Sequence, residues 1–395
     1  MTAPAAETYR LRAGQGRWAK AALAGGALLL AATIVGAFFD PRAFFHSYLI
    51  AYLFWLGLAL GSMAFLMLQY LTGGAWGIVT RRTLEAATRT LPLLAVLFIP
   101  IGFGLGSLYD WARPELVRED YILRHRSGYM NVPFFLARAA IYLAIWMVLA
   151  FFLNRWSAQQ DQNRPDLHSR LSRLSAGGSI LYGFSITFAA VDWAESLQTR
   201  WASTMWGFMF IAAEAITALG FLIIVMTLLS RHEPMSGVLK PDHFHDLGKM
   251  LLGTLMLWAY FTFCQYLIVW SQNLTSEISY YLPRTGTSWG WLGVALFVMQ
   301  FVIPVLLLLS RPLKRNAYLL SAVAVIVLVM RYMDLIWIVL PAHFRTGFGI
   351  GWMDVLTPIG LGGVWLWAFL RELPRFPLLP VCAPELQEAL AHETR

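Results

Sequence analysis

The sequence predicts an all-α membrane protein with ten transmembrane helices. Of its 395 residues, 58% are hydrophobic and only 13% are charged, and the mean hydropathy of +0.59 is too high for a soluble domain of this length. The apolar residues collect into ten runs, each close to the about 20 residues that a helix needs to cross the hydrocarbon core. Polar segments are too short for a separate soluble domain, so residues 1–395 are predicted to form a single membrane domain.

Each apolar run is interpreted as one membrane-spanning helix. In order, the runs are Ala21–Phe39, Tyr48–Leu71, Leu91–Leu108, Val132–Leu153, Ala176–Val191, Trp201–Leu229, Met250–Trp270, Trp289–Leu309, Ala317–Leu340 and Met353–Leu370. The first run follows a basic segment but is longer than the about 7–15 residues of a signal-peptide core, so it is predicted to be a retained span. The fifth run is short, and its ends are the least defined.

Small residues in the second and third spans indicate where helices approach one another closely. Gly57 and Gly61 have the small-xxx-small spacing, and Gly102, Gly104 and Gly106 repeat such small residues in the next span. Because glycine has no side chain, backbones can touch at these positions.

The distribution of basic residues predicts the orientation. Most of the 30 Lys and Arg residues fall in alternate connections, beginning with the N-terminal segment, so the positive-inside rule places both termini in the cytoplasm. Residues 1–20 and 371–395 are then cytoplasmic segments. The net charge of +8 belongs to the inner membrane surface, where it faces lipids, and no nucleic-acid partner is needed to explain it.

Cysteine and histidine usage excludes several kinds of metal centre. With only Cys264 and Cys382, we expect no disulfide framework, no paired-cysteine zinc site and no Cys-x-x-Cys-His haem attachment. The eight histidines lie in connections or at the ends of the predicted spans, whereas a membrane b-type haem needs axial ligands at depth. No metal site is predicted in this chain, and any redox metal is expected in partner subunits.

Glu214 is the ionisable residue predicted to lie nearest the middle of the bilayer. At a helical rise of about 1.5 Å per residue, it lies about 17–20 Å from the start of the sixth span. That span offers no other ionisable residue, and Thr217 is the nearest hydroxyl on the same face. A carboxyl in this position is either a silent, hydrogen-bonded group or a proton carrier.

A charged pair, Arg331 and Asp334, interrupts the ninth span within the stretch MRYMDLIW. Their spacing of three residues puts both on one helix face, roughly 14 Å and 9 Å below the outer end of the span. They are predicted to pair with each other, either as a structural ion pair or as one station of a proton or ligand path.

Other ionisable residues crowd the outer half of the membrane region. Asp110, Asp192 and Glu195 lie at outer span ends, and Arg138 enters the fourth span about 9 Å from the outer side. This asymmetry predicts a polar route between the midplane and the outer face. The candidate residues for a proton path are Glu214, Arg331, Asp334, Asp192, Glu195, Arg138, Asp110 and Thr217.

Three segments carry a resemblance to a known family. Residues 258–284 read WAYFTFCQYLIVWSQNLTSEISYYLPR, with a pattern formed by Trp258, Tyr260, Gln265, Tyr266, Trp270, Asn273, Glu277, Tyr281 and Arg284. The others are HRSGYMNVPFFLARAAIYLAIW, residues 125–146, and RYMDLIWIVLP, residues 331–341. Over essentially its whole length the chain resembles the quinol-interacting membrane subunits of bacterial alternative complex III, a quinol:cytochrome c (or other acceptor) oxidoreductase, which are similar to polysulfide reductase membrane subunits.

This resemblance implies two four-helix bundles, spans 2–5 and 6–9, flanked by spans 1 and 10, in the bacterial inner (plasma) membrane. Such a complex has two related ten-span membrane proteins. The shorter length, the inner tail and the predicted lack of a membrane-embedded His resemble the shorter of the two, which is not the usual candidate for quinol oxidation. The implied role is proton conduction and assembly beside the quinol-oxidising subunit.

The resemblance also implies partners and cofactors. The implied partners are a related ten-span membrane subunit, an iron–sulfur subunit, multihaem cytochrome c subunits and small membrane anchors. The implied cofactors are menaquinone or ubiquinone, haem c and iron–sulfur clusters, all of them in the complex and none held by metal ligands of this chain.

Two other functions stay open at this point. The first bundle could itself bind a quinone in a pocket lined by Tyr109, Trp111 and Arg138, with Asp110 accepting protons. A secondary transporter is a different class, but transporters usually have interrupted helices in matching halves, and the prolines of this chain do not fall at matched positions.

Overall fold

The protein is an all-α membrane protein. The computed structural model describes residues 9–11, 15–161, 166–344, 347–380 and 386; most of these residues are helical, and none lies in a β-strand. Ten helices within those ranges are long and apolar enough to cross a membrane, which confirms the predicted fold class.

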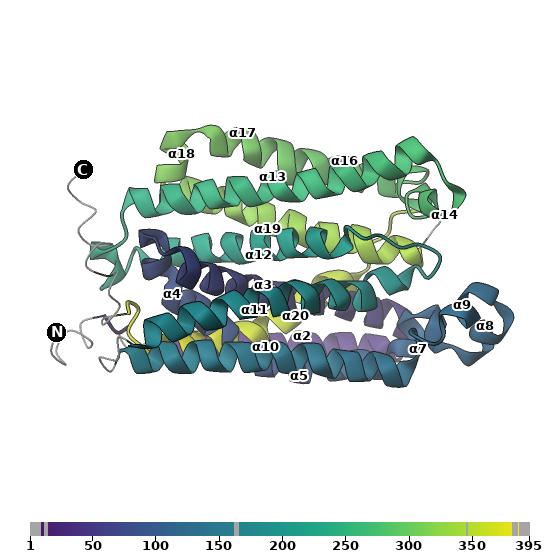
Figure 1. The fold of residues 1–395 in the computed structure, drawn as a ribbon, viewed down its shortest axis with the longest axis horizontal. Helices are drawn as coiled ribbons and strands as arrows, with labels where there is room; N and C mark the ends of the chain where they lie inside the picture. Colours follow the sequence, from purple (N-terminus) through teal and green to yellow (C-terminus); the bar gives the residue numbers. More distant parts are fainter. Residues whose placement is uncertain (1–8, 12–14, 162–165, 345–346, 381–385, 387–395) are drawn as a thin grey trace.

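The ten crossings follow the order of the predicted runs (Figure 1). They are α2 (Gln15–Ala37), α3 (Pro41–Thr72), α4 with α5 and α6 (Ala75–Thr88, Leu91–Leu97 and Ile99–Phe103), α10 (Val132–Gln160), α11 (Asp166–Trp193), α12 (Trp206–Leu229), α13 (Pro241–Gln272), α16 with the π-helical η4 and α17 (Trp289–Ala295, Leu296–Val302 and Ile303–Leu309), α19 (Ala317–Val339) and α20 (Trp352–Glu372).

Several helices continue beyond the apolar runs that predict them. The third crossing begins at Ala75 instead of near Leu91, because the polar side chains of α4 are buried against protein and need not face lipid. The fifth, predicted as Ala176–Val191, belongs to α11, which begins ten residues earlier at Asp166. Hydropathy therefore identifies the apolar part of a crossing, whether it faces lipid or protein, and misses a polar part.

Side-chain caps and glycines set the helix ends. Asp40 accepts a hydrogen bond of 3.0 Å from the Ala43 amide at the start of α3, and Asn131 accepts one of 3.0 Å from the Phe134 amide at the start of α10. α3 ends at Thr72 and is followed by Gly73, whose φ of +69° favours glycine.

Short helices connect the crossings at both ends of the molecule. They are α7 (Leu105–Leu108), η1 (Asp110–Ala112), α8 (Pro114–Glu119), α9 (Tyr121–Arg126), η2 (Glu195–Leu197), η3 (Met235–Gly237), α14 (Thr275–Ile278), α15 (Leu282–Thr285), α18 (Arg311–Arg315), η5 (Leu340–Ala342) and η6 (Leu373–Arg375). We call the end with α8, α9 and α14 the loop end (Figure 1). At the opposite, terminal end, the Leu378 amide donates a hydrogen bond of 2.8 Å to the Tyr9 carbonyl.

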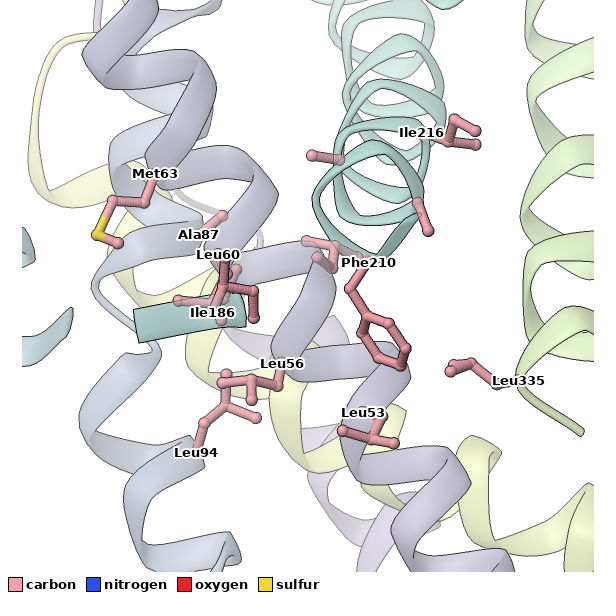
Figure 2. Packing of buried hydrophobic residues seen from close by; sticks show 14 of the residues in the cluster. Leu53, Leu56, Leu60, Met63, Ala87, Leu94, Ile186, Phe210, Ile216 and Leu335 are labelled. Carbon is pink, nitrogen blue, oxygen red and sulfur yellow. The ribbon is translucent and has the colours of Figure 1, made fainter. Parts of the chain in front are cut away.

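Helix α3 occupies the centre of the molecule and contacts α4, α11, α12, α19 and α20. Figure 2 shows apolar side chains of α3, α4, α5, α11, α12 and α19 in one core; the labelled residues are Leu53, Leu56, Leu60, Met63, Ala87, Leu94, Ile186, Phe210, Ile216 and Leu335. Because α3 packs directly on α12, spans 2–5 and 6–9 share a core. Their grouping into two four-helix bundles stays a prediction.

The contact between α3 and α12 depends on the small residues of the second span. A Cβ atom at Gly61 would lie 2.2 Å from the Glu214 carbonyl oxygen and 2.7 Å from its carbonyl carbon, which is closer than atoms can approach. The third-span glycines differ: a Cβ at Gly104 would meet the Phe45 ring at 2.2 Å, whereas one at Gly106 would meet nothing within 4 Å.

Replacing Gly61 with Ala is expected to destabilise the protein by about 1–3 kcal/mol, because the added methyl group pushes α3 away from the α12 backbone. Thermal unfolding in detergent measures this effect. The matched control is Gly177→Ala in α11, where the new Cβ meets nothing within 4 Å and alanine is a better helix former. Equal melting temperatures for the two variants would contradict the prediction.

Candidate functional site

Glu214 is buried inside α12, with 4% of the residue exposed. Its Oε2 atom accepts a hydrogen bond of 2.6 Å from the Tyr182 hydroxyl of α11. A Cβ at Gly57 of α3 would lie 3.3 Å from the Glu214 Cγ, so this glycine makes room for the carboxyl side chain. Thr217, the predicted neighbour, donates its hydroxyl back to the Ala213 carbonyl at 2.8 Å and is engaged with its own helix.

Arg331 and Asp334 form the predicted ion pair on α19, with 2.5 Å between Arg331 Nη1 and Asp334 Oδ2. The two residues are only 3% and 5% exposed, so they are covered by protein and not by lipid. The guanidinium lies 6.0 Å from the centre of the Phe210 ring of α12, and its charge acts on Glu214 of that helix. We call Glu214, Tyr182, Arg331 and Asp334 the midspan cluster.

Tyr280 lies at the loop end, between α14 and α15. It interacts electrostatically with both Asp334 and Glu195. Burial raises the pKa of Tyr280 to about 12 in spite of the nearby Arg284 guanidinium, so its hydroxyl stays protonated at neutral pH. Glu195 accepts a hydrogen bond of 3.1 Å from the Ser203 amide, while its other carboxylate oxygen is buried without a partner in the described part of the chain. Carboxyl and phenol groups thus follow one another from α12 to the loop end.

Arg284 is a buried cation. It belongs to the pattern that carries the family resemblance, but the sequence predicted no role for it. Its guanidinium donates hydrogen bonds to the carbonyls of Tyr280 at 2.6 Å, Trp337 at 3.0 Å and Ile338 at 2.7 Å. The last two belong to the final turn of α19, where carbonyls lack helical partners and the helix dipole is negative. Arg284 therefore caps the helix that carries the Arg331–Asp334 pair. Burial lowers the pKa of this guanidinium below its usual range.

Arg138 and Asp192 form a second buried ion pair, between α10 and α11. Arg138 Nε and Nη2 donate to the two Asp192 carboxylate oxygens at 2.7 and 2.9 Å, and the Tyr142 hydroxyl donates to the same carboxylate at 2.9 Å. Arg138 Nη1 also donates to the Tyr129 carbonyl at 2.9 Å. Both carboxylate oxygens are occupied, which is typical of a pair that holds helices together.

The predicted quinone-binding residues divide between the core and the surface. Tyr109 and Trp111 are buried and stacked, with ring centres 4.9 Å apart. The Tyr109 hydroxyl donates to the Trp193 carbonyl at 2.8 Å, and the Trp111 indole N–H donates to the Ser196 hydroxyl at 3.2 Å. The Asp110 side chain is 48% exposed, and the arginine of this set belongs to the ion pair above. A quinone headgroup would have to displace these internal hydrogen bonds.

Two histidines, one buried and one partly buried, form a pair at the loop end. The rings of His46, near the start of α3, and His343, just after η5, have centres 3.9 Å apart. His46 is 1% exposed, and its Nδ1 lies 2.6 Å from the Arg42 carbonyl oxygen. Burial lowers the pKa of His343 below its usual value of 6.5. His46 lies at a span end, as predicted, but the sequence did not indicate that it is buried.

A charged cluster at the terminal end was also missed. On α4, Glu85 is completely buried and pairs with Arg82 at 2.7 Å, Arg89 at 3.1 Å and Arg81 at 3.3 Å, and the Ser157 hydroxyl of α10 donates to the same carboxylate. We call these five residues the terminal-end cluster. The sequence predicts that these arginines lie in a cytoplasmic connection, because a buried arginine cannot be told from an exposed one in a sequence.

The predicted C-terminal tail begins by covering this cluster. The Phe376 ring lies 4.2 Å from the Arg89 guanidinium, and Leu378 and Leu379 are buried. Residues 381–385 and 387–395, which complete the predicted tail, lie outside the described residues.

Comparison with known proteins adds no assignment. No family model matches the chain, and no curated protein is significantly similar to it. Within the described ranges, no three His, Cys, Asp or Glu side chains are grouped as the ligands of a metal ion would be.

Proposed function

We propose that this chain is a proton-conducting membrane subunit of a bacterial respiratory quinol:cytochrome c (or other acceptor) oxidoreductase of the alternative complex III type. The observation that carries the proposal is Glu214, a carboxyl buried within a membrane span, bonded to Tyr182 and next to the Arg331–Asp334 pair. Ionisable groups at this depth are costly in lipid, and most belong to ion or proton paths.

The proposed route runs from Glu214 past Arg331 and Asp334 to Tyr280, and then to Glu195 at the loop end. Each successive pair interacts electrostatically or through a hydrogen bond. Carboxyl and phenol groups accept and release protons. Of the eight candidates, Glu214, Arg331, Asp334 and Glu195 belong to this route. Arg138 and Asp192 hold α10 against α11, Thr217 bonds to its own helix, and Asp110 lies at the surface.

The resemblance to the complex III subunits involves the same region. Trp258 and Tyr281, two residues of that pattern, line a small cavity together with Arg331 and Asp334, and Arg284 caps the helix that carries them. The proposed partners are therefore those of the complex: a related ten-span subunit, an iron–sulfur subunit, multihaem cytochrome c subunits and small anchors. The chain would lie in the bacterial inner membrane with the terminal end cytoplasmic and the loop end outside.

Extraction of the tagged full-length chain from its native membrane in mild detergent tests this assignment. We expect co-purification of subunits with haem c and iron–sulfur spectra, together with quinol-oxidising activity. The same extraction with an unrelated tagged ten-span protein is the control for adventitious capture. If the chain purifies without other subunits, haem or quinol-oxidising activity, the proposal is wrong.

A further inference from the structure

A small cavity lies beside the Arg331–Asp334 pair, between α12, α13, α19 and the segment that contains Tyr280 and Tyr281. Its volume is about 20 Å³, and its lining residues are Trp206, Met209, Phe210, Ala213, Trp258, Thr262, Tyr280, Tyr281, Arg331, Asp334, Trp337 and Ile338. A water molecule needs at least about 10–15 Å³ of such space. The cavity therefore has room for one water and is too small for a quinone headgroup or a lipid chain.

Three polar atoms of the lining residues have no hydrogen-bond partner within the described part of the chain. They are the Arg331 Nε–H, the Trp337 indole N–H and the Thr262 hydroxyl, and each is buried. Buried polar groups in folded proteins nearly always have a partner, which is often an ordered water. All three groups belong to residues that line one water-sized space, and a bound water needs two to four polar partners.

We propose that this cavity binds one water molecule. The Arg331 Nε–H and the Trp337 indole N–H donate to the water oxygen, and the two water hydrogens are donated to the Thr262 hydroxyl and the Asp334 carboxylate. This arrangement uses every hydrogen-bonding position of the water. A metal cation is a poor alternative occupant, because the Arg331 guanidinium repels positive charge.

The function of this water rests on the proposed proton route, whereas its presence does not. In the route it holds the Asp334 carboxylate in place through one of its hydrogens and passes no proton itself, because both acceptor positions of its oxygen are occupied by N–H groups that keep their protons. Thr262 and Trp337 then become positioning residues that hold this water. Neither was a candidate for the proton path from the sequence.

Radiolytic hydroxyl-radical labelling of the complete complex tests for the water directly. X-ray pulses split bound water in place, so buried side chains next to a water are oxidised in spite of their burial. We expect Trp206 and Trp258, which are 1% and 6% exposed, to be oxidised several-fold faster than Trp146, which is fully buried and bonded to Ser185 away from this cavity. Labelling of Trp206 and Trp258 no faster than Trp146 would show a dry cavity and overturn the proposal.

Two matched variants test whether the oxidation of Trp258 depends on a proposed hydrogen-bond partner of the water. Thr262→Val keeps the side-chain shape but removes a water partner, and we expect it to lower oxidation of Trp258 several-fold. Thr254→Val on the same helix removes a hydroxyl that bonds back to the Met250 and Leu251 carbonyls, and should leave the label unchanged. Equal labelling in both variants would remove Thr262 from the site and contradict the proposed arrangement.

The two proposals can fail separately. Strong labelling with normal proton release in a Glu214→Gln complex would keep the water and overturn the proton route. Absent labelling together with lost proton release would keep the route and overturn the water.

Discussion

Replacement of Glu214 by Gln is expected to lower quinol-driven proton release by at least about tenfold while the complex stays assembled. Gln has nearly the same shape and can still accept the hydrogen bond that Tyr182 donates at 2.6 Å, so the packing of α11 on α12 is preserved. An amide, unlike a carboxyl, does not take up and release a proton near neutral pH. The measurement is the number of protons released per quinol oxidised, followed with a pH-sensitive dye, by the complex reconstituted in liposomes.

Thr217→Val is the matched control for this variant. Thr217 lies three residues further along the same helix and is also buried. Its hydroxyl donates a hydrogen bond to the Ala213 carbonyl. Proton release should therefore be close to that of the wild type. If the Glu214→Gln complex assembles and releases protons normally, Glu214 is a silent structural group and the chain is a scaffold.

Replacement of Glu85 by Gln is expected to cause the largest loss of stability, about 3–5 kcal/mol. Glu85 is the only acidic residue of α4 and pairs with three arginines of the terminal-end cluster, all of them largely or fully buried. Without the negative charge of Glu85, Asp161, which pairs with Arg82, is left to balance three guanidinium groups that repel one another where water cannot screen them. The yield of folded protein and its thermal unfolding, followed by size-exclusion chromatography after heating, measure this loss.

The control for Glu85 is an ion pair that water can reach. Asp242 and Arg315 lie 2.9 Å apart at the surface, with 70% and 37% of their side chains exposed. Asp242→Asn should change stability little, since solvent screens such pairs. A Glu85→Gln protein as stable as Asp242→Asn would show that the terminal-end cluster tolerates its uncompensated charge, which would contradict the prediction.

Local features of the candidate site could be predicted from the sequence. Arg331 and Asp334 are three residues apart, so helical geometry alone brings them together, and the structure confirms their pairing. The partner of Glu214 could not be predicted in this way, because Tyr182 is 32 residues away on a different helix. Thr217, chosen because it shares a helix face with Glu214, bonds instead to the backbone of its own helix.

Burial of charge was the main property that sequence reasoning missed. Arg81 and Arg82 lie before the third apolar run, where basic residues normally face the cytoplasm. In the structure they are 1% and 2% exposed, because Glu85 and polar side chains of α10 compensate them inside the protein. Compensation of this kind depends on which helix lies opposite, and hydropathy contains no such information.

The sequence by itself determined that this chain is an all-α membrane protein with ten crossings, because lipid requires long apolar helices and hydropathy records that requirement residue by residue. It also determined that Glu214, Arg331 and Asp334 lie within these apolar helices. Only the tertiary structure decided which of these groups meet, which are saturated by partners and where a water-sized space remains. Those properties depend on contacts between helices that are far apart in the chain. If a helix turned a different face toward its partner, every neighbour of its side chains would change.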